Sequence, residues 1–168
     1  YSIENNVAIN DTEKIIEIAK NITIDFDDIG IVANGINIEN EIRLPRINKI
    51  VSPVAAIKEV REILVEIQRT ISQNNNIVME GRDIGTVVFP NANYKFYIDA
   101  SIEVRAKRRF LEFKEKRPNI TIQEVEDSIR NRDKIDSTRE ASPLKQAADA
   151  THLDTSKMNI EEVVMSLP

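Results

Sequence analysis

The chain of 168 residues lacks cysteine and tryptophan altogether, and it contains only four glycines and one histidine. Without cysteine it can form no disulfide and no thiolate metal site, and His152 alone argues against a catalytic triad or a histidine metal cluster. No apolar run approaches the roughly 20 residues of a membrane span, and no signal-peptide pattern opens the chain. We therefore expect a cytoplasmic enzyme or binding protein without a membrane partner.

Aromatic residues are scarce, at 5% of the total, and the net charge of −5 hides a segregation along the chain. Residues 1–48 hold 4 Lys and Arg against 9 Asp and Glu, residues 49–145 hold 18 against 15, and residues 146–168 hold 1 against 4. The positive charge is concentrated in the middle segment, much of it as arginine. This pattern favours a small anionic ligand over nucleic acid, which binds broad basic faces and stacks its bases on aromatic side chains.

The length fits one domain, and strands alternating with helices predict an α/β fold with a mainly parallel sheet. Expected helices cover residues 1–20, 53–73, 102–116, 122 to at least 132, and 160–167. Expected strands cover residues 22–26, 29–33, 36–42, 77–79, 94–98 and 151–154. The first three strands form a small antiparallel insert, because Asn34-Gly35 is a strong signal for a two-residue hairpin.

Polar residues before the apolar stripes predict the positions where helices begin. These helix-start signals are Asp11 or Thr12, Ser52 before Pro53, Ser101, and the capping box Thr121-Ile-Gln-Glu124.

The stretch IVMEGRDIGTVVFP, residues 77–90, places three charges and two glycines between apolar runs that are typical of strands. In a parallel sheet, ligands bind where the strands end. Arg82 can fork two hydrogen bonds to a phosphate, and an ionised Asp83 can accept from an exocyclic amine such as cytosine N4 or from a ribose hydroxyl. A surface turn in which both residues pair with neighbouring charges is an equally good interpretation of this motif alone.

Two helical segments carry further arginines. At about 100° per residue, Arg105, Arg108 and Arg109 share one helix face, where phosphates or nearby glutamates would offset their repulsion. In RNRDKIDSTR the same spacing aligns Arg132, Asp136 and Arg139, which fits either a nucleotide site or mutually satisfied ion pairs. Three arginine-rich places in one acidic chain together favour a phosphorylated ligand.

At IVMEGRDIGTVVFPNA the chain resembles the bacterial cytidylate kinase family, which phosphorylates CMP and dCMP with ATP and magnesium. Three more stretches resemble the family in order and spacing: VSPVAAIKEVREILVEIQR at 51–69, DASIEVRAKRR at 99–109 and NRDKIDSTREASPLKQAADATHLDTS at 131–156. The resemblance implies a P-loop nucleoside monophosphate kinase-like α/β fold over residues 1–168. Within it, residues 22–50 would be a monophosphate-binding β insert and residues 105–140 a lid.

The resemblance also implies roles for the residues that match. Ser52, Arg61 and Asp83 would read the base and sugar of the monophosphate, and Arg82 would clamp its phosphate. Arg132 and Asp136 would contact the sugar, and Arg139 would lie at the nucleotide. The expected catalytic set is Arg82, Arg132 and Arg139, and the expected ATP and lid set is Arg105, Arg108 and Arg109.

The general phosphate-loop pattern G-x-x-x-x-G-K-[ST] does not occur in the sequence, which begins at Tyr1, although the resemblance implies a glycine-rich loop ending Gly-Lys-Gly/Ser-Thr on a first strand and helix. We therefore expect the larger C-terminal part of a kinase, inactive by itself, that acts as a monomer on CMP, dCMP and ATP. Magnesium would arrive with ATP, without protein ligands among these residues. The alternative is a non-catalytic CMP-binding module. Asp154, Thr155 and Ser156 are expected to cap the final helix, with contact to the donor's adenine as the other interpretation.

Overall fold

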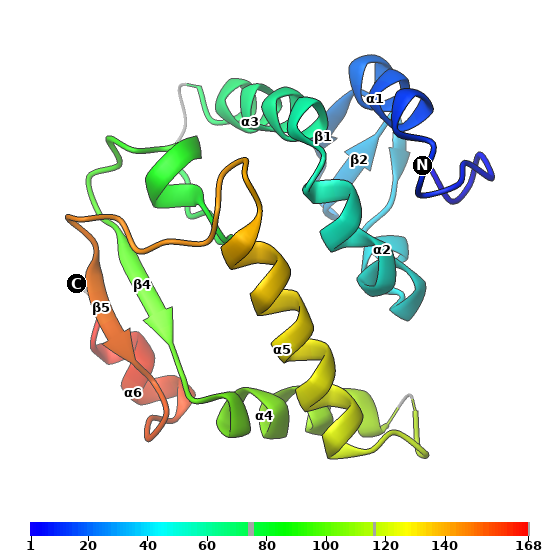
Figure 1. Cartoon of the computed structure of the whole chain (residues 1–168). Helices are drawn as coiled ribbons and strands as arrows, with labels where there is room; N and C mark the ends of the chain where they lie inside the picture. The colour runs from blue at the N-terminus through cyan, green and yellow to red at the C-terminus, as the bar shows by residue number, and fades with distance from the viewer. Residues whose placement is uncertain (74–75, 116, 168) are drawn as a thin grey trace.

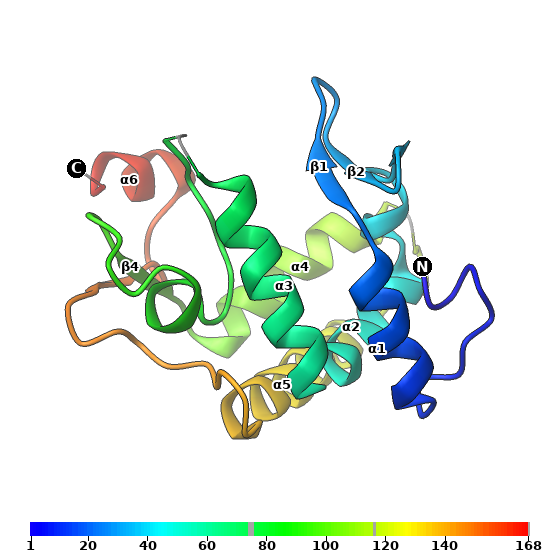
Figure 2. The ribbon, with the colours of Figure 1, turned by 90° about the horizontal axis from the view of Figure 1, so that it is seen from above.

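The computed structural model describes residues 1–73, 76–115 and 117–167. It combines helices with two small sheets, and the two chain ends lie on opposite sides of the molecule (Figures 1 and 2). The helices are α1 (Thr12–Asn21), α2 (Pro45–Ala55), α3 (Lys58–Ile71), α4 (Ile102–Lys114), α5 (Ile122–Thr138) and α6 (Ile160–Met165). The strands are β1 (Ile24–Phe26), β2 (Ile31–Ala33), β3 (Ile36–Asn37), β4 (Phe96–Asp99) and β5 (Thr151–Asp154). None of the helices described is both long and apolar enough to cross a membrane.

Helix α1 packs against α3, and both views place the two helices side by side (Figures 1 and 2). Their shared core contains Ile15, Ala19 and Val60. The helix begins at Thr12 because the Asp11 carboxylate accepts a hydrogen bond from the Lys14 backbone N–H. The helix expected over residues 1–10 is therefore wrong: this segment forms turns.

The expected hairpin insert is confirmed as an antiparallel sheet in the order β1-β2-β3. Ala33 pairs with Ile36 across the turn, where Asn34 and Gly35 both take positive φ, 49° and 78°. All three strands are shorter than expected, and the third ends at Asn37 because the chain then leaves the ladder and forms a 3₁₀ turn, η1, over Glu41–Arg43. Figure 2 shows β1 and β2 projecting away from the helices.

The single helix expected over residues 53–73 is wrong. Helix α2 starts at Pro45, for which the first helical turn is favourable, and it runs through Ser52 and Pro53 to Ala55. Ile57 then takes an extended conformation (φ −69°, ψ 117°), which separates α2 from α3. Ser52 is thus a residue inside a helix rather than an N-cap.

Neither apolar run of IVMEGRDIGTVVFP forms a strand. Residues 77–79 pair with no strand in the described parts of the chain, and Val78 is fully exposed. Ile84–Val88 forms a π-helical turn, η2, instead. The Asp83 carbonyl accepts from the backbone N–H groups of Thr86, Val87 and Val88 at 3.3, 2.9 and 3.3 Å, and this shared acceptor closes the wide turn.

The C-terminal part follows the expectation more closely. β4 and β5 pair in parallel, with Phe96 opposite Thr151 and Asp99 opposite Asp154. Ser101 caps α4, whose expected end at Lys116 lies outside the described residues, and the Thr121–Glu124 capping box opens α5. The overall architecture mixes helices with one parallel and one antiparallel sheet.

The expected capping of α6 by Asp154, Thr155 and Ser156 is wrong, because Asn159 makes that cap through a capping box with Glu162. The Asp154 carboxylate instead accepts from Ser156, whose hydroxyl oxygen accepts from the Ser101 N–H at 2.8 Å. Thr155 Oγ1 donates to the Asp99 carbonyl at 2.9 Å. These residues fasten β5 to the junction of β4 and α4.

Candidate functional site

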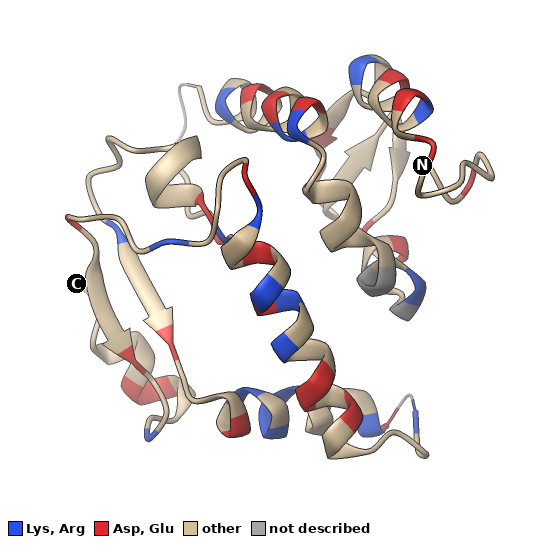
Figure 3. Cartoon of the chain, in the orientation of Figure 1, with Lys and Arg blue, Asp and Glu red and all other residues tan. Residues whose placement is uncertain are grey.

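One cavity of about 180 Å³ collects side chains from α2, α3, α5 and the turn before η2. All seven residues predicted to bind the substrate line it: Ser52, Arg61, Arg82, Asp83, Arg132, Asp136 and Arg139. Figure 3 shows both basic and acidic residues on α5, the helix that supplies Arg132 and Asp136. The structure therefore brings together residues that lie up to 87 positions apart in the chain.

Arg69 of α3 holds the turn that presents Arg82 and Asp83. Its guanidinium donates to the carbonyl oxygens of Val88 at 3.0 Å and Val87 at 2.7 Å. Because these carbonyls belong to the π-helical turn that starts after Asp83, Arg69 fixes the turn to α3.

Arg61 and Asp83 form a buried two-point ion pair. Arg61 Nε donates to Asp83 Oδ2 at 3.1 Å, and Arg61 Nη2 contacts Asp83 Oδ1. The Asp83 side chain is 3% exposed. A carboxylate has about four lone-pair positions, so Asp83 retains acceptor capacity toward the cavity.

Asp136 lies at the centre of three arginines. Its carboxylate is 3.3 Å from Arg82 Nε, 3.6 Å from Arg132 Nε and 3.6 Å from Arg139 Nη1. These distances exceed those of ordinary N–H···O hydrogen bonds, about 2.7–3.2 Å. Asp136 Oδ2, Arg132 Nε and Arg139 Nη2 are buried without a hydrogen-bond partner in the described parts of the chain. A polar ligand or water bound in the cavity would satisfy these atoms.

Burial, together with neighbouring cations, lowers the pKa of two of these arginines. Burial lowers the pKa of Arg132, and the nearby Arg82 cation lowers it further. Burial likewise lowers the pKa of Arg139, with the Arg61 cation adding to the effect. Since both groups stay positively charged at neutral pH, an anion placed among them would relieve their repulsion.

The three arginines predicted for the lid lie elsewhere, and none lines this cavity. Arg105 contacts Asp133 of α5 at 2.5 Å, and Arg108 donates to the Thr155 carbonyl at 2.7 Å. Arg109 pairs with Glu112 at 3.5 Å and lies over the Phe113 ring. Glu112, one of the glutamates close to these arginines along the chain, is confirmed as an ion-pair partner. A lid role for these residues stays a prediction.

Sequence reasoning missed Asp133 and Gln68. Gln68 lines the cavity from α3, and Asp133 contacts both Arg82 and Arg105. Asp133 could have been found, because it lies three residues before Asp136 and so shares its helix face.

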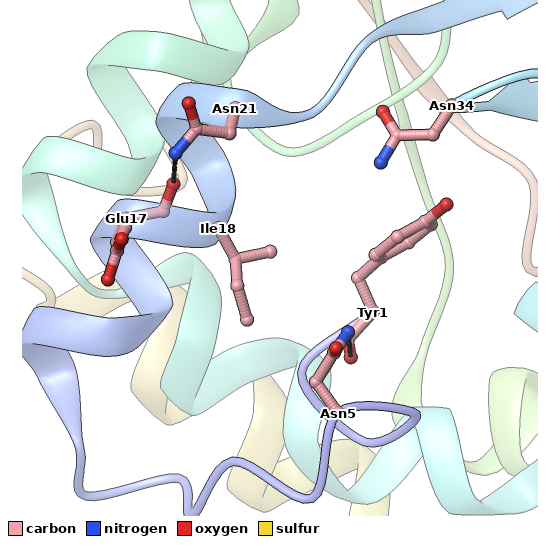
Figure 4. A pocket seen from close by; sticks show the side chains of 6 residues that line it. All are labelled: Tyr1, Asn5, Glu17, Ile18, Asn21 and Asn34. Atoms are coloured by element: carbon pink, nitrogen blue, oxygen red, sulfur yellow. Dashed lines mark hydrogen bonds between the residues drawn. The ribbon is translucent and has the colours of Figure 1, made fainter.

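A second depression, of about 250 Å³, lies between α1 and the hairpin and is lined by Tyr1, Asn5, Glu17, Ile18, Asn21 and Asn34. Figure 4 shows the Tyr1 ring extending toward Asn34, and the Tyr1 hydroxyl donates to the Ala33 carbonyl at 3.3 Å. Its one charged lining residue, Glu17, is acidic, so this depression does not suit a phosphate. Among the described residues, no group of three or more Asp, Glu, His or Cys could hold a metal ion.

Comparison with known proteins gives a consistent result. The family model for cytidylate kinase matches residues 1–167. A cytidylate kinase of Clostridium botulinum (strain Loch Maree / Type A3) is 51% identical over 163 residues, which are 97% of this chain and 75% of that protein. The cytidylate kinase of Fusobacterium nucleatum subsp. nucleatum is 48% identical over 164 residues, 98% of this chain and 75% of its own. The cytidylate kinase of Alkaliphilus oremlandii (strain OhILAs) is 49% identical over 162 residues, which are 96% of this chain and 75% of that protein.

Proposed function

The chain belongs to the cytidylate kinase family, and from this premise we propose that its arginine-lined cavity binds CMP or dCMP for phosphorylation by ATP. The enzyme is a nucleoside monophosphate kinase that produces CDP or dCDP. We further propose that the parallel pair β4–β5 belongs to the sheet of a P-loop nucleoside monophosphate kinase fold.

One observation supports this location best: four arginines and two buried aspartates from three separate segments line the same cavity. Four guanidiniums against those two carboxylates and Glu80 give the lining a positive balance. A dianionic monophosphate suits this balance, whereas a neutral ligand would leave the arginines mutually repelled.

In the proposed complex, the phosphate of CMP lies among Arg82, Arg132 and Arg139. An oxygen of that phosphate attacks the γ-phosphorus of ATP, a new P–O bond forms, and the bond to the ADP oxygen breaks. Charge spreads over the transferred phosphoryl oxygens during this step. The guanidiniums would hold the acceptor in line and stabilise that charge, since they need no reorganisation when the charge develops.

The base and sugar would be read by the other lining residues, with Arg132 also reaching the sugar. A cytosine N4 amine donates hydrogen bonds, and the ionised Asp83, held in place by Arg61, is a pure acceptor. Ser52 from α2 would add a hydroxyl contact to the base, and Asp136 would accept from a sugar hydroxyl.

Magnesium is proposed to enter with ATP. This ion is commonly held by substrate phosphates and waters together with one or two carboxylates. Asp83 and Asp136 are each engaged by arginines, so these two carboxylates do not fit a magnesium site. The lid role of Arg105, Arg108 and Arg109, the insert role of residues 22–50, the cytoplasmic location and the monomeric state remain proposals.

A coupled assay on the full-length natural protein tests the function. With ATP and Mg²⁺, we expect turnover of CMP and dCMP and none of AMP or GMP. Arg132→Met should lower kcat/KM for CMP roughly 10- to 100-fold, because the variant loses one charge-assisted hydrogen bond to the phosphate. The matched control is Arg130→Met on the same helix, because Arg130 pairs with Glu126 away from the cavity and should be dispensable.

Two outcomes would overturn the proposal. Phosphorylation of AMP or GMP but not CMP would reject the substrate. Binding of CMP without turnover by the full-length protein would favour the non-catalytic module.

A further inference from the structure

Helices α4 and α5 are joined by an ion pair whose acidic member also reaches the cavity. Asp133 Oδ2 contacts Arg105 Nη1 of α4 at 2.5 Å. Its other oxygen, Oδ1, lies 3.7 Å from Arg82 Nη1. One carboxylate therefore lies between a lining arginine and an arginine outside the lining.

The two halves of this contact differ in strength. Arg105 is firmly held, since its Nε also donates to the Ala100 carbonyl at 2.9 Å, just after β4. On the other side, Asp133 Oδ1 is buried without a hydrogen bond, and 3.7 Å is too long for one. Asp133 is thus anchored by Arg105 and steers Arg82 by charge alone.

Arg82 depends on this steering because its other contact within the described parts of the chain is also weak. Its side chain is 35% exposed, and its other ionic contact, from Nε to Asp136, is also loose at 3.3 Å. The two carboxylates lie one turn apart on α5 and attract different nitrogens of the same guanidinium. Together they fix the plane of the Arg82 guanidinium. A phosphate bound through two N–H groups requires that plane to be oriented correctly.

We propose that Asp133 is a positioning residue: it orients the Arg82 guanidinium toward the acceptor phosphate. Its contact with Arg105 links that orientation to the position of α4. The inference rests on the proposed function, since it names a residue that acts through the phosphate-binding arginine. A purely structural role, as a tie between α4 and α5, is the competing explanation.

Asp133→Asn in the full-length protein separates these explanations. The variant keeps the shape and removes the charge, so Arg82 should lose its orientation. We expect the Kd of CMP to rise about tenfold, with cytidine, which has no phosphate, bound as in the wild type. A simple tie between helices would change the melting temperature and leave the ratio of CMP to cytidine affinity unaltered, and that result would overturn the proposal.

Two further variants make the test specific. In an Arg82→Ala background, Asp133→Asn should have no additional effect on CMP affinity, whereas an unchanged tenfold loss would show that Asp133 acts by another route. Asp127→Asn is the matched control: its carboxylate accepts from Gln123 on the exposed side of α5 and should leave both affinities unchanged. Because cytidine and CMP binding by the wild type are measured first, a failure of the proposed function appears separately as absent CMP binding or turnover.

Discussion

Replacing Asp136 by asparagine perturbs the site at its centre. Asp136 is 3% exposed, and its carboxylate faces Arg82, Arg132 and Arg139 at 3.3–3.6 Å. Without its charge, three guanidiniums repel one another inside a poorly solvated site. Removing one partner of a buried ion pair costs about 3–5 kcal/mol, and we expect roughly 3 kcal/mol here because the contacts are longer than hydrogen bonds.

For a chain of this size, that loss corresponds to a fall in melting temperature of roughly 6–12 °C. Thermal or urea unfolding of the full-length protein measures it, with Asp127→Asn as a control of the same substitution on the same helix. The control carboxylate is exposed and should cost less than about 0.5 kcal/mol.

Inorganic phosphate should reverse part of the damage. The uncompensated guanidiniums of the variant should bind an anion more tightly than those of the wild type. At a phosphate concentration about tenfold above the variant's Kd, linkage adds roughly 1.4 kcal/mol of stability. An Asp136→Asn protein as stable as the wild type, or a phosphate-induced rise equal in both, would refute the electrostatic description of the cavity.

Three other predictions follow from single side chains. Arg82→Lys should lower kcat/KM for CMP by about tenfold or more in the coupled assay, because an ammonium cannot form two parallel hydrogen bonds to a phosphate. Near-normal turnover would show that Arg82 does not bind the phosphate. Gly35→Ala should lower the free energy of unfolding by about 1 kcal/mol in urea titrations through backbone strain alone, since φ is +78° and, beyond the two chain neighbours, no described residue has an atom within 4 Å of the new Cβ. Hydrogen bonds from the Asn37 side chain and the Ile29 and Gly30 N–H groups lower the pKa of Asp27. The Asp27 carboxylate should thus stabilise the hairpin fully above its unfolded-state pKa, and this stabilisation should be lost as the pH falls through its lower folded-state pKa. Amide exchange in the hairpin measures the effect. The same pH dependence in Asp27→Asn as in the wild type would contradict it.

Local signals along the chain were sufficient for several elements. The hairpin at Asn34-Gly35, the Ser101 cap, the Thr121 capping box and strand β5 were predicted correctly, because each depends on neighbours within a few residues. The split between α2 and α3 and the turn at Ile84–Val88 were not predicted. Ser52-Pro53 fits an N-cap as well as a helix interior, and an apolar run bounded by glycine fits a strand as well as a wide helical turn.

By itself the sequence determined the family and the starts of α1, α4 and α5, and it singled out the residues that we propose carry the chemistry. Residue types and their short spacings encode those properties. Only the tertiary structure decided which charges meet: Asp83 with Arg61, Asp136 among three arginines, and Asp133 between Arg82 and Arg105. Each of these pairings joins segments that are distant along the chain or selects among several arginines on one helix face. Their energies depend on the burial and separation that packing of α3, α4 and α5 creates.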